Sequence, residues 1–231
     1  MKENWKRELL TGIALLAAFI VWTLLIQTVD VQAIGPKVTT VGFAAFNGWF
    51  HQLTGVHWTL YTVTDWLGLV PIFICMGFGC VGLIQWIKRK CVLRVDPDIL
   101  LLGVYYILVI FGYLFFEMVP MNYRPVLIDG ILEASYPSST TLLVLSVMPT
   151  LTLQMNRRCE NPKLRRAAKA FAALFSAFMV IGRLIAGVHW ATDIVGSVLL
   201  SWGLFSLYRA SVSRTDQRGT ARRKEETSGI Q

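Results

Sequence analysis

Three polar stretches in the second half of the chain hold residue types that can bind and attack phosphate. They are residues 122–125, 136–141 and 182–193. In the last stretch His189 and Asp193 are four residues apart, so both side chains lie on one side of a helix that begins there. A carboxylate bonded to one imidazole nitrogen orients the ring and leaves the other nitrogen free as a nucleophile or base. This pair is therefore a candidate for nucleophilic catalysis.

Groups that bind an oxyanion occur in the same stretches. Arg124 and Arg183 each offer a planar guanidinium fork, which suits the oxygens of a phosphoryl group. Ser138, Ser139 and Thr140 open a predicted helix, where hydroxyls and free backbone N–H groups make an anion site. The three histidines do not cluster with acids or cysteines at metal-ligand spacing, so the sequence predicts neither a metal nor another cofactor.

Each of these residues also has a purely structural interpretation. Taken alone, Arg124 or Arg183 would more often pair with Glu117, Asp129 or Glu133 than bind a ligand. The hydroxyls can simply cap a helix, and a single histidine–aspartate pair is more often a satisfied polar pair than a catalytic one. The set favours a phosphate site only because all its members fall on one face of the predicted topology.

The elements that hold these residues belong to a membrane protein. Of the 231 residues 55% are hydrophobic and only 16% are charged, which is too apolar for a soluble domain of this length. The first apolar segment lacks a small-residue cleavage site, so we expect an anchor and not a removed signal peptide. Six segments approach the roughly 20 apolar residues that cross a bilayer as a helix. They are 9–28, 66–87, 99–118, 138–155, 170–186 and 190–208. We predict an all-α polytopic membrane protein with six transmembrane helices.

The positive charges fall almost entirely on one side of this topology. Of the 22 lysines and arginines, 19 lie in the N-terminus, the second and fourth loops and the tail. The positive-inside rule makes this side cytoplasmic, together with both termini. Lys37, Arg124 and Arg183 remain for the other side, and the two arginines lie at the outer ends of spans, where a cation needs a partner or a role. Because topology explains the net charge of +8, we predict no nucleic-acid partner.

The six spans predict a single membrane domain over residues 1–208, followed by a basic, disordered cytoplasmic tail over 209–231. Between the first two spans, residues 30–64 contain an extra helical segment. Its aromatic residues Phe43, Phe46, Trp49 and Phe50 fall on one face, which suits a helix lying in the membrane interface. The segment either covers the entrance to the site or forms an ordinary aromatic belt.

The order and spacing of the polar residues resemble the membrane branch of the type 2 phosphatidic acid phosphatase and vanadium haloperoxidase superfamily. The motifs of this family read K-x6-R-P, P-S-G-H and S-R-x5-H-x3-D, on a six-helix core with the active site at the outer face. The resemblance runs from about residue 99 onward. The matching residues are Arg124-Pro125 in the first motif, Pro137-Ser138 in the second, and Arg183, His189 and Asp193 in the third.

The chain departs from the motifs at two chemically important positions. Glu117 stands at the lysine of the first motif, and Thr140 stands at the histidine of the second. The resemblance implies that His189 attacks phosphorus, that Asp193 orients it, and that the arginines bind phosphate. In the family the second-motif histidine protonates the leaving group, and this chain lacks that donor. Glu117 could pair with an arginine or supply the missing proton, and His57 on the same side is another candidate donor or a plain interfacial histidine.

The resemblance implies a lipid phosphatase, a phosphoric ester or anhydride hydrolase that acts through a phosphohistidine. We expect it in the plasma membrane, as a bacterial inner-membrane protein, with an extracytoplasmic active site and a phosphorylated membrane lipid as partner. Losing a general acid costs about 10²–10⁴-fold in rate, but a lipid monophosphate leaves a diphosphate as a stable anion. A polyprenyl diphosphate is therefore the favoured substrate. The alternative is a catalytically silent relative that binds phosphorylated lipid or a partner protein.

Overall fold

The structure is a computed structural model that describes residues 5–228, with side chains described through residue 221. Within this range the chain is helical, and its only strand-like pairings are isolated β-bridges. Two short 3-10 turns lie at Pro36–Val38 and Val92–Arg94. The α-helices are α1 (Trp5–Thr28), α2 (Ala44–Thr54), α3 (Trp58–Leu67), α4 (Leu69–Arg89), α5 (Pro97–Met118), α6 (Ser139–Arg158), α7 (Pro162–Ile185) and α8 (Ala191–Ser228).

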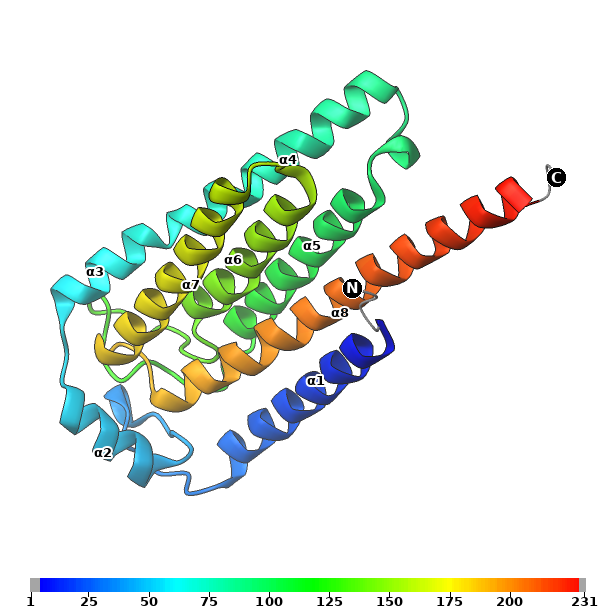
Figure 1. Ribbon diagram of the computed structural model, residues 1–231. Helices are drawn as coiled ribbons and strands as arrows, with labels where there is room; N and C mark the ends of the chain where they lie inside the picture. The colour runs from blue at the N-terminus through cyan, green and yellow to red at the C-terminus, as the bar shows by residue number, and fades with distance from the viewer. Residues whose placement is uncertain (1–4, 229–231) are drawn as a thin grey trace.

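The long helices form one bundle whose loops gather at two ends (Figure 1). Helix α8 packs along α1, α5 and α6, while α7 packs against α6. The α5–α6 and α7–α8 loops meet at the same end as α2, and we call this the site end. The α4–α5 and α6–α7 loops lie at the opposite end, where α8 also finishes, and we call this the basic end. The polar stretches singled out in the sequence therefore share the site end.

Among residues 5–228, five segments are long and apolar enough to cross a membrane. They are Trp5–Thr28, Trp58–Arg89, Pro97–Met118, Pro162–Ile185 and Ala191–Ala221. The predicted all-α membrane class is confirmed. Only five of the six predicted spans, however, correspond to a segment that meets the criterion of length and apolar composition. The remaining one, predicted over 138–155, is α6, which is a helix of 20 residues but is much less apolar.

Helix α6 is polar because it lies inside the bundle. It contacts α4, α5, α7 and α8, and its Thr150 and Gln154 are fully buried. Tyr106 and Thr150 share a hydrogen bond of 2.7 Å between their hydroxyls, and Gln154 Nε2 donates to the Tyr208 hydroxyl over 2.7 Å. A helix whose polar groups are bonded to neighbouring helices need not be apolar. A hydropathy criterion therefore undercounts it.

The predicted extra segment between the first two spans contains α2. Phe46 and Trp49 on this helix are exposed, as expected for an aromatic outer face, whereas Phe43 stacks on Trp22 of α1 with 5.2 Å between the ring centroids. Buried Asn47 Nδ2 donates to the Thr192 hydroxyl over 2.9 Å. Helix α2 is thus attached to the first turn of α8 at the site end.

Helix α8 extends past residue 208, where the sequence predicted the last span to end and a disordered tail to begin. It remains helical to Ser228, since part of the extension still faces the bundle. Ala210 and Val212 are buried, and Asp216 accepts two hydrogen bonds from Arg157 of 2.8 and 2.9 Å. Residues 229–231 of the predicted tail, and Lys2 among the N-terminal cations, lie outside the described residues.

Ion pairs hold the helices together at the basic end. Asp98, at the start of α5, is only 8% exposed and its Oδ2 lies 2.7 Å from Arg158 Nη1 and 3.1 Å from Arg157 Nε. Arg158 also contacts Gln154 and Asp96. A nearly buried carboxylate needs such partners because its charge is otherwise unsolvated. Together with the Arg157–Asp216 pair, these contacts join α5, α6 and α8.

Replacing Arg158 with alanine should destabilise the bundle by removing a partner of buried Asp98. We expect a loss of about 2 kcal/mol, less than the about 3–5 kcal/mol for a fully buried pair, because Arg157 remains and Arg158 is 27% exposed. The thermal unfolding midpoint in detergent measures the change. Arg165→Ala on α7, a residue without an ion pair among the described residues, is the matched control; equal midpoints for the two variants would contradict the prediction.

Candidate active site

His189, Ser135 and Asp193 form a buried chain of polar contacts at the site end. His189 Nδ1 lies 3.1 Å from both the hydroxyl and the carbonyl oxygen of Ser135. The Ser135 hydroxyl donates to Asp193 Oδ2 over 2.5 Å, whereas that oxygen is 3.9 Å from His189 Nδ1. The aspartate therefore reaches the imidazole mainly through the serine.

The position of Asp193 follows from local helix chemistry. It lies in the first turn of α8, and its Oδ2 accepts the backbone N–H of Trp190, the residue just before the helix, over 2.9 Å. This is the reciprocal half of a capping box, and a negative charge is favoured at a helix N-terminus. Asn122 Nδ2 donates to Asp193 Oδ1 over 3.4 Å, and Trp190 Nε1 donates to the Tyr123 carbonyl over 2.8 Å. The α5–α6 loop is thereby fastened to the start of α8.

Arg183 extends from the last turn of α7 toward the other imidazole nitrogen. It is 1% exposed, and its Nη2 lies 3.4 Å from His189 Nε2. Its Nη1 is 3.5 Å from the Thr64 hydroxyl and 3.6 Å from Asp65 Oδ1, and the guanidinium stacks over the Tyr61 ring at 5.0 Å. Helix α3 thus supplies the surroundings of this arginine.

Two glycines allow α3 and the α2–α3 connection to approach the site. A Cβ on Gly182 would lie 2.8 Å from Cγ2 of Thr64, so α3 could not pack as closely on α7. Gly187 has a φ of +71°, and a Cβ there would lie 1.9 Å from the Gly55 carbonyl oxygen. The His57 backbone N–H also donates to the Ala186 carbonyl over 3.0 Å. The absence of a side chain at Gly182 and Gly187 therefore allows the close packing of α3 and the α2–α3 connection against the site.

Arg124 provides a second buried guanidinium. Its Nε lies 3.0 Å from Glu133 Oε2, an ion pair without hydrogen-bond geometry, and the residue is 8% exposed. Nε and Nη1 of Arg124 and Nε of Arg183 have no hydrogen-bond partner in the part of the chain that the structure describes. Buried N–H groups without acceptors are costly. An anion with several oxygens would satisfy them.

The start of α6 adds backbone donors to the site. Ser138 precedes the helix, but its hydroxyl donates to the Thr141 hydroxyl over 3.1 Å and does not cap the backbone. Its N–H donates to the Asp193 carbonyl over 3.4 Å, and its carbonyl accepts the Ser197 hydroxyl over 2.9 Å. The first-turn N–H groups, which include those of Ser139 and Thr140, therefore have no side-chain cap and can bind an anion.

The surroundings of His189 keep its imidazole neutral. Burial lowers the pKa of His189 well below its usual value, and the charges of Arg124 and Arg183 lower it further. Because Arg183 Nη2 can only donate, the geometry favours the tautomer whose lone pair is on Nε2, with the proton on Nδ1 facing Ser135. The nucleophilic nitrogen then faces the arginines.

The structure brings together His189, Asp193, Arg183 and Arg124, as the sequence analysis expected, but not the two candidate proton donors. Glu117 is exposed on α5, and His57 is exposed with its Nε2 2.8 Å from the Thr54 carbonyl. Among the described residues, no hydrogen bond or ion pair joins either of them to an arginine. The acids paired with the arginines are Glu133 and Asp65.

Sequence reasoning missed several neighbours of the site, above all Ser135, Thr64, Asp65 and Tyr61. Ser135 directly precedes a polar stretch that was singled out, but its type and spacing carried no signal of their own. Helix α3 was placed in the interfacial segment, so its contact with Arg183 was not expected. The described residues include no group of three or more His, Cys, Asp or Glu side chains that could hold a metal.

Comparisons with known proteins bear on the family and the fold of this chain. A family model of the PAP2 superfamily matches residues 99–216, just over half of the 231 residues. The fold is similar to the crystal structure of a transmembrane PAP2-type phosphatidylglycerolphosphate phosphatase from Bacillus subtilis, with a TM-score of 0.63 and 16% identity over 88% of this chain and 96% of that chain. No curated protein matches the sequence. The family resemblance noted in the sequence is confirmed, and at this identity the structural likeness bears on the fold alone.

The unpaired guanidinium N–H groups predict that the protein binds inorganic phosphate at this site. Arg124→Gln and Arg183→Gln should each weaken binding by about 10–100-fold, the usual effect of losing a hydrogen bond to a charged group. Titration calorimetry of the purified protein measures the affinity. Arg166→Gln, at the basic end, is the control, and unchanged affinity in both site variants would place the anion elsewhere.

Proposed function

Because the chain belongs to the PAP2 superfamily, we propose that it is an integral membrane lipid phosphatase that hydrolyses a phosphorylated membrane lipid. The observation that carries this proposal is the neutral imidazole of His189. Its Nε2 lies 3.4 Å from the buried guanidinium of Arg183, and the charge of Arg124 also acts on the ring. Both guanidinium groups have N–H donors without a partner. Such an arrangement supplies a nucleophile and oxyanion stabilisation together.

The proposed reaction proceeds in two displacements. His189 Nε2 attacks phosphorus, and the Nε2–P bond forms as the bond from phosphorus to the leaving oxygen breaks. Arg124, Arg183 and the first-turn N–H groups of α6 stabilise the equatorial oxygens. The Nδ1 proton stays hydrogen-bonded toward Ser135, and Asp193 offsets the positive charge that develops on the ring. The oxygen of a water molecule then attacks phosphorus, and the Nε2–P bond breaks with its electron pair returning to Nε2. The proton of this water passes to the solvent, and orthophosphate is released.

The leaving group decides which lipid is the better substrate. Thr140 stands where the family has a histidine, and a hydroxyl does not protonate a departing alkoxide efficiently. A lipid monophosphate departing from a diphosphate is already a stable anion and needs no such proton. We therefore favour a polyprenyl diphosphate over a phosphate monoester such as phosphatidic acid.

The orientation follows from the charge of the two ends. We propose that α6 is a sixth span, enclosed by the other helices, so that the basic end faces the cytoplasm and the site end faces outward. The bacterial inner membrane is the proposed location, and the helical continuation of α8 after residue 208 is then cytoplasmic. The site would meet lipids of the outer leaflet.

Phosphate release from defined lipids tests the function. Purified protein in detergent should release phosphate from farnesyl diphosphate faster than from phosphatidic acid, and His189→Gln should reduce release by at least about 10³-fold because it removes the nucleophile. His57→Gln is the control, since this exposed histidine has no contact with the arginines and should retain activity. Phosphate binding without any turnover would support the catalytically silent relative. Equal rates on both lipids would remove the leaving-group argument.

Ser135 is proposed as a positioning residue for His189. Ser135→Ala should lower kcat by about 10–100-fold, the usual effect of losing a hydrogen bond to a charged group, because Asp193 then loses its link to the imidazole. KM should change little, since the arginines still hold the phosphate. Ser135→Thr, which retains a hydroxyl, should recover part of the rate. A rise in KM with kcat unchanged would instead show that Ser135 contacts the substrate.

A further inference from the structure

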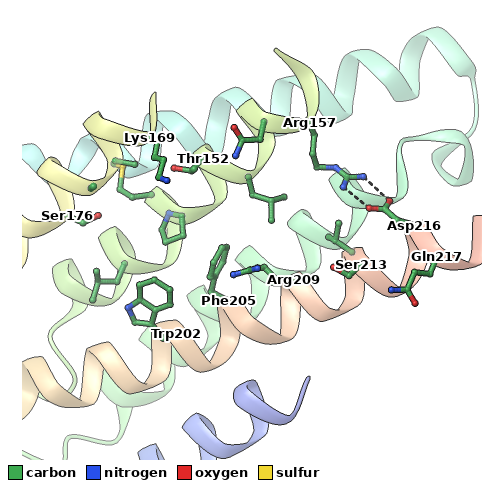
Figure 2. A pocket seen from close by; sticks show the side chains of 18 of the residues that line it. Thr152, Arg157, Lys169, Ser176, Trp202, Phe205, Arg209, Ser213, Asp216 and Gln217 are labelled. Atoms are coloured by element: carbon green, nitrogen blue, oxygen red, sulfur yellow. Dashed lines mark hydrogen bonds and ion pairs between the residues drawn. The ribbon is translucent and has the colours of Figure 1, made fainter. Parts of the chain in front are cut away.

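A large cavity lies between α6, α7 and α8, toward the basic end and away from the candidate active site. Its volume is about 1320 Å³, above the roughly 300–1,000 Å³ of ordinary small-molecule pockets. Helices α7 and α8 both pack along α6 but touch each other only slightly, so the cavity occupies the space between them. Figure 2 shows side chains from all three helices around this space. The cavity has room for a ligand larger than a metabolite.

The inner part of the cavity is apolar. Its wall includes Leu145 and Met148 of α6, Ala172 of α7, and Trp202 and Phe205 of α8. The large apolar side chains that α8 contributes are Trp202, Phe205 and Val212, which span roughly 15 Å of helix, half of the roughly 30 Å hydrocarbon core of a bilayer. Beyond Val212 the lining on α8 continues, mostly with polar residues, to Ala221. The length of the apolar part matches one leaflet. An acyl chain is therefore a better fit than a compact ligand.

The outer part of the cavity carries excess positive charge. Arg157, Lys169 and Arg209 line it, against the single acid Asp216. Asp216 is already bonded to Arg157, and Arg209 Nη2 lies 3.0 Å from Glu8 Oε1 of α1.

Lys169 is the cation of this group with the most freedom to bind a ligand. It is exposed and has no ion pair among the residues that the structure describes. Figure 2 shows it on the opposite wall of the cavity from Arg209. The opening is thus suited to a negatively charged headgroup.

We propose that this groove binds one anionic phospholipid, with its phosphate beside Lys169 and Arg209 and one acyl chain along the apolar wall. In the orientation proposed above, the lipid comes from the cytoplasmic leaflet, and in this respect alone the inference rests on the proposed function. Basic pockets between membrane helices on that side favour anionic headgroups. The bound lipid fills the gap between α7, which holds Arg183, and α8, which holds Asp193.

Lipid binding to the purified full-length protein tests the proposal. Native mass spectrometry in detergent would count dioleoylphosphatidylglycerol and dioleoylphosphatidylcholine bound per chain. We expect one phosphatidylglycerol to be retained in preference to phosphatidylcholine, and Lys169→Gln to weaken its binding about fivefold, the effect of one cation near an anionic headgroup. Ser176→Phe, which places a ring in the apolar part of the cavity, should weaken binding of both lipids.

Matched variants separate this site from other ways of holding lipid. Lys163→Gln removes the same charge from an exposed position of α7 outside the cavity and should leave binding unchanged. Equal losses in Lys163→Gln and Lys169→Gln would indicate diffuse attraction and overturn the proposal. A loss of lipid binding confined to Arg183→Gln would place the lipid in the active site and would also overturn the proposal. A protein dimer that forms without lipid would overturn it too, because a second copy of the chain would then be the occupant of the groove. Phosphate release by Lys169→Gln should be normal, because Lys169 lies outside the candidate active site. Lipid binding is measured without catalysis, so the lipid test remains valid even if the protein has no phosphatase activity.

Discussion

The burial of two guanidinium groups beside one imidazole is the constraint on which the site end depends. Arg124 and Arg183 repel each other and are nearly withdrawn from water, so the fold must supply compensating groups. It does so incompletely: Glu133 and Asp65 each approach one arginine, and Tyr61 stacks on Arg183, but several N–H donors keep no acceptor. An incompletely satisfied pair of buried cations is poor for stability and well suited to binding a polyanion.

The same cations explain how a histidine can act as a nucleophile there. Their charge adds to burial in keeping His189 neutral, and Arg183 occupies the side of the ring where the Nε2 lone pair must lie. On the opposite side, Ser135 contacts Nδ1 and is itself hydrogen-bonded to Asp193. The aspartate is itself fixed by the first turn of α8. Helix capping and the orientation of the imidazole therefore depend on the same carboxylate.

The two ends of the bundle use charge in different ways. At the basic end, Asp98 and Asp216 are closely paired with arginines, and these pairs hold α5, α6 and α8 together. At the site end the pairing is looser and cations are left with donors to spare. Helix α6 connects the ends, and it can carry polar residues through the bundle because α5 and α8 bond to them. Its polarity is the reason that hydropathy alone does not identify it as a span.

Much of this protein could be predicted from its sequence, because apolar length, one-sided charge and the spacing of Arg183, His189 and Asp193 are local or additive properties. They indicated the helical membrane class, the shared end of the polar stretches and the family. Only the tertiary structure decided which side chains meet across elements: Ser135 between imidazole and carboxylate, Asp65 and Glu133 beside the arginines, and Glu117 and His57 away from them. Such contacts depend on how closely α3 and the loops pack on α7 and α8, and that packing is set by contacts between residues far apart in the chain.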